Sequence, residues 1–251
     1  MPSEVDLIPI VSEPVLHYPA EEALIASDLH FGIESEMLRS GIWVPNRSQK
    51  RTERMLKIIK DTGAKSLILL GDVKHKVPFS SFQERKDLDT FFSEVCNFVD
   101  VSIVPGNHDG GLQDLAPSQV NFYPSEGFIL GGVGMHHGHA WPSKDLMECD
   151  VLIMGHNHPV LTFRDRVGKL QKEPCWVRAP MISHKRYDNI PNTLIILPAF
   201  AELAGRAINK SPLSGLGPLI KNGLVDLEKA RIESLEGLDF GELKYLTDLK
   251  L

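Results

Sequence analysis

Five short segments of this chain carry aspartate, asparagine and histidine, the side chains that bind hard and borderline divalent metal ions. They are Asp28-Leu29-His30, Gly71-Asp72, Gly106-Asn107-His108-Asp109, His137 and Gly155-His156-Asn157-His158. Each segment follows an apolar run that is typical of a buried strand. We therefore expect these side chains to meet at one end of a sheet and to bind two metal ions, an arrangement that mostly breaks phosphate esters.

The spacing of these residues divides them into two sets of ligands that share one carboxylate. Residues two apart in an extended segment point to the same side, so Asp28 and His30 can reach one ion. The carboxylate of Asp72 has two oxygens and can bridge two cations. The two predicted sets are Asp28, His30, Asp72 and His158 for one ion, and Asp72, Asn107, His137 and His156 for the other.

The ligand types also restrict the metal. Imidazole and oxygen ligands without thiolate fit Mn²⁺, Fe or Zn²⁺ better than Ca²⁺ or a soft metal. Taken singly, each motif is more often a turn or a hydrogen-bonded core histidine than a ligand. Their shared position after apolar runs, in this order, favours the two-metal interpretation.

Bulk properties predict one soluble domain. The chain has 251 residues and a formal net charge of −6, which argues against a broad nucleic-acid-binding surface but allows a local basic groove. We expect a single domain over 1–251, with 204–251 as a loop-rich C-terminal extension. The acidic N-terminus lacks the features of a signal peptide, and no apolar run is long enough to span a membrane. Three cysteines without a CxxC pair predict reduced thiols and a cytoplasmic location.

The hydrophobic pattern predicts the elements that position the motifs. Strands are expected at 23–27, 66–70, 101–104, 119–123, 127–130, 133–136, 151–154, 160–164, 175–179 and 193–197. Helices are expected at 33–40, from a cap at Asn46 to about Thr62, and from a cap at Ser80 or Ser81 through Phe98. Segment 204–223 reads as a long loop, and 230–235 as a strand followed by a short helix. These elements predict an α/β fold in which two mixed sheets pack together with helices outside.

In this order, the motifs D-x-H, GD, GNH with a following acid, a lone H and GHxH resemble those of the calcineurin-like metallophosphoesterase superfamily. The resemblance extends over roughly residues 23–198 and implies a four-layer αββα sandwich that usually binds manganese. Segments 28–34 and 71–75 resemble the Mre11/SbcD-related small archaeal and bacterial phosphoesterases, which implies a link to DNA repair. Protein phosphatases are excluded because Lys74-His75-Lys76 stands where they carry D-R-G. Full-length nucleases of that branch carry further domains, for which this sequence is too short. Long duplex ends are therefore not the expected substrate.

The same resemblance implies roles beyond metal binding. His108 would protonate the leaving oxygen while Asp109 holds its ring, and His75 would position the phosphate. His139 and Arg178 are candidate substrate-binding residues. The sequence around each residue is equally compatible with an ordinary surface side chain. His136 is expected to point away, because neighbours on a strand alternate faces. Four other basic residues could contact substrate or could be ordinary solvated surface charges: Arg164, Arg166, Lys185 and Arg186. Trp141 and Trp176 could stack on a base or could simply pack in the protein.

Three functions remain open at this stage. The first is a phosphodiesterase that acts on nucleic acid, single-stranded or short, or on nucleotides through a metal-bridging hydroxide. The second is a phosphomonoesterase or cyclic-nucleotide phosphodiesterase, which the short chain and acidic balance favour. The third is a non-catalytic metal-binding interaction module, which the complete motif set disfavours. The sequence leaves the substrate and the oligomeric state open.

Overall fold

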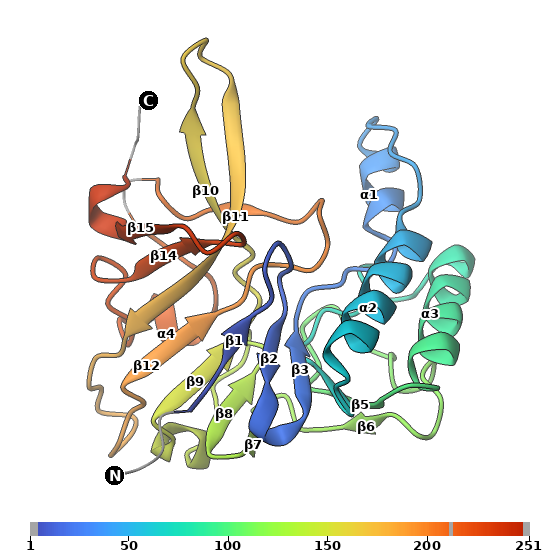
Figure 1. Ribbon diagram of the computed structural model, residues 1–251, viewed down its shortest axis with the longest axis horizontal. Coiled ribbons are helices and arrows are strands. Elements are labelled where there is room, and N and C mark those ends of the chain that lie inside the picture. Colours follow the sequence, from blue (N-terminus) through green and yellow to red (C-terminus); the bar gives the residue numbers. More distant parts are fainter. Residues whose placement is uncertain (1–4, 211–212, 248–251) are drawn as a thin grey trace.

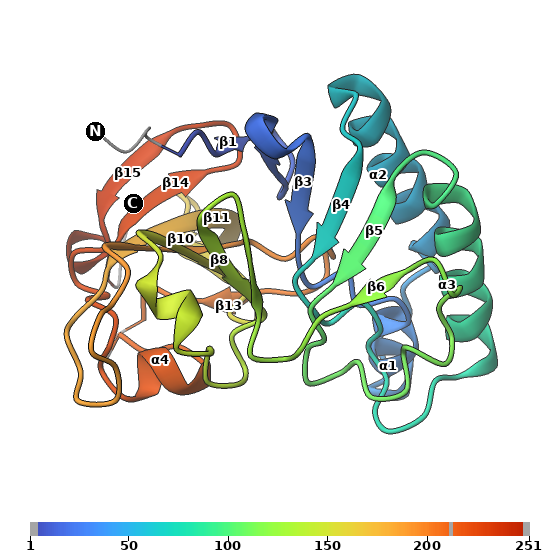
Figure 2. The ribbon, with the colours of Figure 1, turned by 90° about the horizontal axis from the view of Figure 1, so that it is seen from below.

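Two mixed β-sheets, each built from one half of the chain, pack face to face in the computed structural model, which describes residues 5–210 and 213–247 (Figures 1 and 2). The first sheet has the order β1-β2-β3-β4-β5-β6. Strands β3 to β6 are parallel, whereas β1 and β2 pair antiparallel at one side. The bounds are β1 (Ile8–Pro9), β2 (Leu16–Tyr18), β3 (Ala23–Ala26), β4 (Ser66–Leu69), β5 (Asp100–Ile103) and β6 (Asn121–Phe122).

The second sheet has the order β13-β10-β11-β12-β9-β8-β7, and β14 pairs with β11 and β15. Its centre is parallel through β12, β9 and β8, and the pairs β10–β11 and β11–β12 are antiparallel. The bounds are β7 (Phe128–Leu130), β8 (Val133–His136), β9 (Val151–Met154), β10 (Pro159–Arg164), β11 (Leu170–Pro180), β12 (Thr193–Ile196), β13 (Arg206–Ala207), β14 (Arg231–Ser234) and β15 (Asp239–Glu242).

Hydrophobic burial between and outside the sheets gives four layers. Ile25 and Ile68 of the first sheet meet Met135, Ile153 and Trp176 of the second in one buried cluster. Helices α2 (Ser48–Thr62) and α3 (Phe82–Val95) cover the outer face of the first sheet, and α1 (Ile33–Arg39) projects beside them (Figure 1). In the part of the chain that the structure describes, the outer face of the second sheet carries the short helices η2 (Asp145–Glu148), α4 (Gly217–Lys221) and η3 (Leu243–Tyr245). The chain therefore has the αββα arrangement that was expected.

Local signals placed the two long helices correctly. Asn46 was expected as the cap of α2 and accepts the Ser48 N–H at 2.7 Å, but the N-cap position is taken by Arg47, which makes no side-chain cap hydrogen bond. Gly63 ends that helix with a φ of 67°. Ser81 caps α3 in a capping box with Glu84. The expected extension of α3 through Phe98 is wrong. The helix ends at Val95, and Phe98 lies 50% exposed beyond the helix.

The C-terminal part is more structured than its composition suggested. Within the expected loop at 204–223 lie β13 and α4, whose Pro218 stands in the first turn and whose Leu219 is buried. The strand expected at 230–235 is confirmed as β14, but its partner β15 was not predicted, and the following helix is the 3-10 turn η3 (Leu243–Tyr245). These elements are two to five residues long, too short for a periodic signal. Within 5–210 and 213–247, no helix combines the length and apolarity that a membrane crossing requires.

Candidate metal centre

The predicted ligands all follow strands at the same edge of the two sheets. Asp28 and His30 follow β3, Asp72 follows β4, Asn107 and His108 follow β5, His137 follows β8, and His156 and His158 follow β9. The strands β3, β4 and β5 are parallel to one another, as are β8 and β9. Parallel strands bring their carboxyl ends to one edge, which is the usual place of a site in such sheets. Both sheets therefore contribute donors to one location.

The backbone at this edge is unusual. Five predicted ligands have a positive φ: Asp28 (58°), His30 (46°), Asp72 (51°), His156 (65°) and His158 (44°). A left-handed conformation costs a residue with a Cβ about 1–2 kcal/mol, so the fold stores strain at the candidate centre. Two glycines permit the close approach of the loops. A Cβ on Gly71 would lie 2.5 Å from His137 Nδ1, and one on Gly106 would lie 2.2 Å from Asp72 Oδ1.

The first predicted set of ligands is together in space. One donor atom from each of Asp28, His30, Asp72 and His158 lies within 4.8 Å of every other. His158 Nε2 is 3.0 Å from Asp28 Oδ1 and 3.2 Å from His30 Nε2. Two imidazole nitrogens that face each other beside carboxylate oxygens form a donor set suited to a divalent cation.

Three members of the second set lie together in space. Donor atoms of Asp72, His137 and His156 lie within 4.8 Å of one another. His137 Nδ1–H donates to the Leu70 carbonyl at 2.7 Å, so its Nε2 faces Asp72 Oδ2 at 3.5 Å. Asn107 stands next to His108, whose N–H donates to Asp72 Oδ1 at 2.9 Å, but the Asn107 side chain is exposed. Its role as a ligand stays a prediction.

Electrostatics support a cation at this place. Burial alone would lower the pKa of His137, but the neighbouring carboxylates of Asp72 and Asp28 raise the pKa to about 9. Burial would raise the pKa of Asp72, yet His137 and His30 hold it well below its usual range. The Nε2 atom of His137 is buried and has no hydrogen-bond partner among the described residues. Buried carboxylates with such an unpartnered ring nitrogen fit the two divalent ions that the sequence predicts, without identifying the metal.

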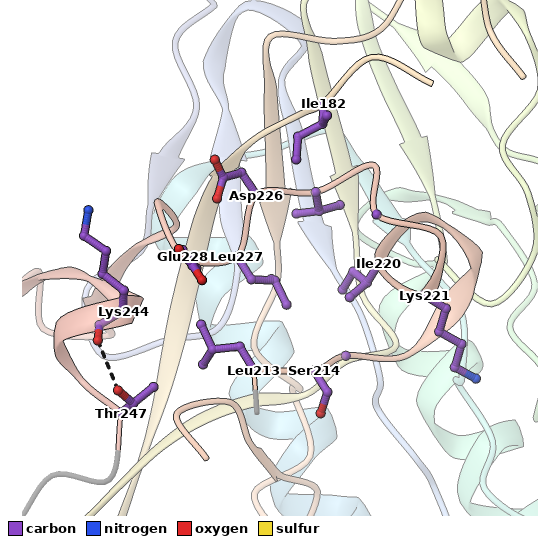
Figure 3. A pocket seen from close by; sticks show the side chains of 13 residues that line it. Ile182, Leu213, Ser214, Ile220, Lys221, Asp226, Leu227, Glu228, Lys244 and Thr247 are labelled. Atoms are coloured by element: carbon purple, nitrogen blue, oxygen red, sulfur yellow. Dashed lines mark hydrogen bonds between the residues drawn. The ribbon is translucent and has the colours of Figure 1, made fainter. Parts of the chain in front are cut away.

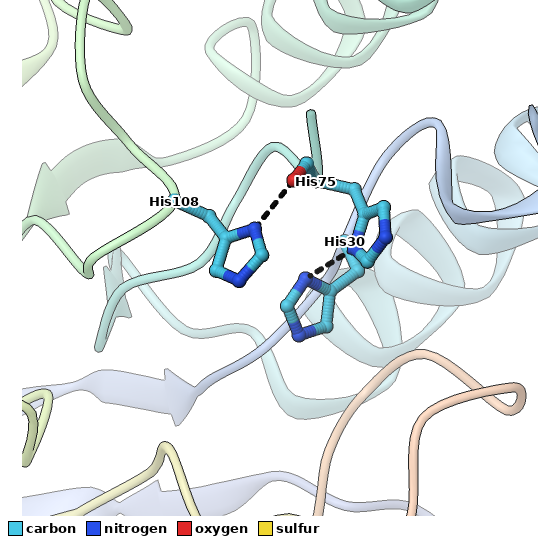
Figure 4. Close-up of side chains that lie close together, drawn as sticks. All are labelled: His30, His75 and His108. Atoms are coloured by element: carbon cyan, nitrogen blue, oxygen red, sulfur yellow. Dashed lines mark hydrogen bonds between the residues drawn. The ribbon is translucent and has the colours of Figure 1, made fainter. Parts of the chain in front are cut away.

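A third group, His30, His75 and His108, lies beside the first set (Figure 4). The rings of His75 and His108 stack with centroids 5.2 Å apart. Glu36 Oε2 accepts the His75 Nε2–H at 2.7 Å, and His75 Nδ1 is 3.1 Å from His30 Nδ1. His75 can thus accept the His30 Nδ1–H, which leaves His30 Nε2 available as a ligand. Glu36 was not predicted, because an exposed helical glutamate carries no motif.

The expected contact between Asp109 and the His108 ring is wrong. Both Asp109 oxygens accept backbone N–H groups, from Lys74 at 3.1 Å and from Gly106 at 2.8 Å. Burial and the charge of Asp72 raise the pKa of Asp109 to about 6. His108 Nδ1–H instead donates to the backbone carbonyl of His75 (Figure 4). The Asp109 N–H closes a turn on the Gly106 carbonyl at 3.2 Å, and the His108 ring lies 5.3 Å from the ring of His30.

The two candidate substrate residues differ in position. The His139 ring lies 5.2 Å from that of His137 and 6.2 Å from that of His156, next to the second set. Arg178 lies in β11, where its Nε is 4.0 Å from Glu233 of β14. No hydrogen bond or ion pair within the described ranges joins Arg178 to the donor sets.

Other side chains that were considered for substrate contact have separate environments. Trp176 is fully buried between the sheets, so packing explains it. Trp141 carries the Arg186 guanidinium at 4.3 Å over its ring. Arg164 donates to the Gly168 carbonyl within the β10–β11 hairpin. His136 is fully buried and belongs to none of the three donor groups.

A cavity of about 770 Å³ lies in the C-terminal part of the chain (Figure 3). Ile182, Leu213 and Ile220 form part of its apolar wall, and Lys221 and Glu228 lie among its charged residues. None of the predicted site residues lines it in the part of the chain that the structure describes. The segment beside it is tied to the centre, because Leu216 N–H donates to Asn157 Oδ1 at 2.6 Å.

A nuclease of Pseudomonas putida, MPE, is similar with 17% identity and a TM-score of 0.54 over 95% of this chain and 100% of that chain. The phosphoesterase Yfce of E. coli matches with 18% identity and a TM-score of 0.43 over 88% and 97%. No curated protein matches the chain. The model of the calcineurin-like phosphoesterase family matches residues 23–180, more than half of the sequence, and the chain belongs to that family.

Proposed function

We propose that this phosphoesterase is a di-metal-dependent phosphodiesterase that acts on nucleic acid or nucleotides. The observation that carries the proposal is the pair of donor sets that share Asp72, with His108 beside them. The proposal is supported by the similar fold of a protein named a nuclease. Manganese is the metal we propose, because the sequence motifs resemble those of a superfamily that usually binds it, and the nitrogen and oxygen donors are compatible with it. The link to DNA repair is part of this proposal and rests on the sequence motifs.

The residues divide the work between binding and proton transfer. Two divalent ions, when bound, activate water and neutralise charge on the phosphoryl group. Asp28, Asp72 and the surrounding imidazoles hold those ions, and Asn107 completes the second set. His108 holds its Nδ1–H on the His75 carbonyl, so the proton that it exchanges is the one on Nε2. We assign that proton to the departing alkoxide, since a poor leaving group needs an acid.

Substrate contacts are proposed for two further histidines. His139 lies beside the second set and can face a phosphate held between the donors. A phosphate contact by His75 requires its ring to give up Glu36 or His30, the partners of its two ring nitrogens. We do not propose a substrate contact for Arg178, because its guanidinium pairs with Glu233 on the neighbouring strand.

The test compares leaving groups in the His108→Ala variant with Mn²⁺ present. Hydrolysis of a dinucleotide, which expels a poor alkoxide, should fall about 10²–10⁴-fold. Hydrolysis of bis(p-nitrophenyl) phosphate, which expels an activated phenolate, should fall less than about tenfold, because that group leaves without an acid. His184→Ala serves as the control, since His184 stacks on Trp141 and belongs to none of the donor groups. Equal losses on both esters would remove the acid role.

Turnover of further phosphate esters by the wild-type protein decides between the proposal and its alternatives. Phosphomonoesters and cyclic nucleotides are included, and a clear preference for either would replace the nucleic-acid proposal. Metal binding without turnover of any phosphate ester would indicate a non-catalytic module. Metal content after dialysis against Mn²⁺, Fe²⁺ or Zn²⁺ tests the choice of metal.

A further inference from the structure

We propose that Glu84 is a positioning residue for His108 and acts on it through the peptide group between His75 and Lys76. The inference rests on the proposed function, because it concerns the proton that His108 delivers. It assigns to Glu84 the orienting role that the sequence had suggested for Asp109.

Glu84 is a buried carboxylate surrounded by backbone donors. It stands in the first turn of α3 and is only 1% exposed. Its Oε1 accepts the N–H of His75 and the N–H of Lys76, both at 2.9 Å. Its Oε2 accepts the N–H of Ser81 at 3.2 Å. A buried charge needs such partners, and these three donors supply them.

One of these hydrogen bonds lies in line with the contact to His108. The N–H of Lys76 and the carbonyl of His75 belong to the same trans peptide group and point in opposite directions. Glu84 therefore binds one end of this peptide while His108 Nδ1–H binds the other end. A carboxylate on the N–H polarises the peptide and makes its carbonyl a stronger acceptor. The series runs from Glu84 through the peptide to the imidazole.

The consequence for His108 is a fixed tautomer. A carbonyl oxygen can only accept, so the ring must keep its hydrogen on Nδ1. Nε2 is then the nitrogen that carries the exchangeable proton. An orienting acceptor on the far ring nitrogen is the usual device for a histidine acid or base, and the acceptor is a backbone carbonyl or a carboxylate.

Helix capping alone does not explain the position of Glu84. The capping box requires only the Ser81 N–H and the Glu84 N–H, which involve Oε2 and the Ser81 hydroxyl. The two N–H groups on Oε1 belong to the loop that follows β4, not to α3. The Gly32 backbone packs closely on this carboxylate, since a Cβ there would lie 2.9 Å from Oε1. Capping and loop binding can thus be separated by mutation.

Four variants test the inference in the metal-loaded full chain. Glu84→Ala should lower kcat on the dinucleotide about tenfold or more, with KM and aryl-ester turnover changed less than about threefold. Glu84→Gln keeps an oxygen that accepts both N–H groups and should recover most of the loss. Glu84→Asp is one methylene too short to reach both the loop and the cap, and replaces Glu84→Ala if that variant does not fold. Ser81→Ala weakens the cap alone and should leave the ratio of the two ester rates unchanged.

A second readout does not depend on activity. Long-range ¹H–¹⁵N NMR spectra report which ring nitrogen of His108 is protonated in the metal-free protein. We expect Nδ1–H in the wild type and Glu84→Gln, and a mixture of tautomers in Glu84→Ala or Glu84→Asp.

The outcomes separate this inference from the proposed function. If the wild type hydrolyses no phosphodiester, the proposed function fails, and the tautomer still decides the role of Glu84. An Nε2–H tautomer in the wild type overturns the inference. Equal losses on both esters in Glu84→Ala, or the same kinetic pattern in Ser81→Ala, overturn it as well.

Discussion

At the scale of single residues, the candidate centre combines functional side chains with an unfavourable backbone. His156 has a φ of 65°, and its neighbours in the fold, Asp28 and Asp72, have 58° and 51°. These values are costly for any residue that has a Cβ. Function and local stability therefore oppose each other at these positions, which is the usual situation where backbone strain clusters.

Replacing His156 by two small residues measures this strain. In the presence of EDTA, His156→Gly should be more stable than His156→Ala by about 1 kcal/mol, because only alanine has to keep a left-handed φ at a cost. Urea unfolding of the two variants provides the measurement. The same pair at His184, which is not among the residues with positive φ, is the control, and there alanine should equal or exceed glycine. A more stable alanine variant at position 156 would contradict the assigned strain.

At the scale of elements, strand ends in the sequence predicted which side chains would lie close together. The runs before Asp72 and His156 are short and continuously apolar, so their buried parallel pairing could be inferred. Parallel pairing then implies that their ligands converge. The orientation of the Asp109 side chain could not be inferred. In a turn, the direction of each side chain depends on the local dihedral angles, which the sequence pattern does not give. The roles of Glu84 and of the His75 carbonyl were also hidden, since they depend on contacts between distant loops and on backbone atoms that every residue has.

Contact between α4 and the loop after His137 gives a prediction for this scale. A Cβ on Gly217 would lie 2.0 Å from the Gly138 carbonyl oxygen, at a φ of 80°. Gly217→Ala should therefore destabilise the protein by more than Gly223→Ala, which has a φ of 75° and open space around the added methyl. Both variants pay the backbone cost of about 1–2 kcal/mol, so the difference in urea unfolding isolates the contact. Equal losses in the free energy of unfolding would show that α4 can shift away from the added methyl group without destabilising the protein.

At the scale of the whole molecule, the donors come from both sheets. Asp28, His30 and Asp72 belong to loops of the first sheet, whereas His137 and His158 belong to loops of the second. Ions bound by both groups would join the two sheets at one edge. The general arrangement of the layers could be predicted from the alternation of elements, but the short C-terminal elements that widen the second sheet could not.

Thermal unfolding tests this joining. Mn²⁺ at about 100 times its Kd should stabilise the folded chain by about 2.7 kcal/mol for one site, and EDTA should remove the effect. Asp72→Ala should abolish most of the rise in Tm, because both donor sets use this carboxylate. Asp61→Ala is the control, since Asp61 pairs with Lys57 on the exposed side of α2. An unchanged Mn²⁺ response in Asp72→Ala would contradict the shared carboxylate.

Each sheet is also continuous in the chain, since β1 to β6 end at Phe122 and β7 begins at Phe128. A protease site inserted between these strands would therefore divide the protein into two fragments, each with only part of the donors. Reassembly of such fragments would restore the centre. Divalent cations bound by donors of both fragments would then stabilise their association, and recovered turnover would report fragment complementation.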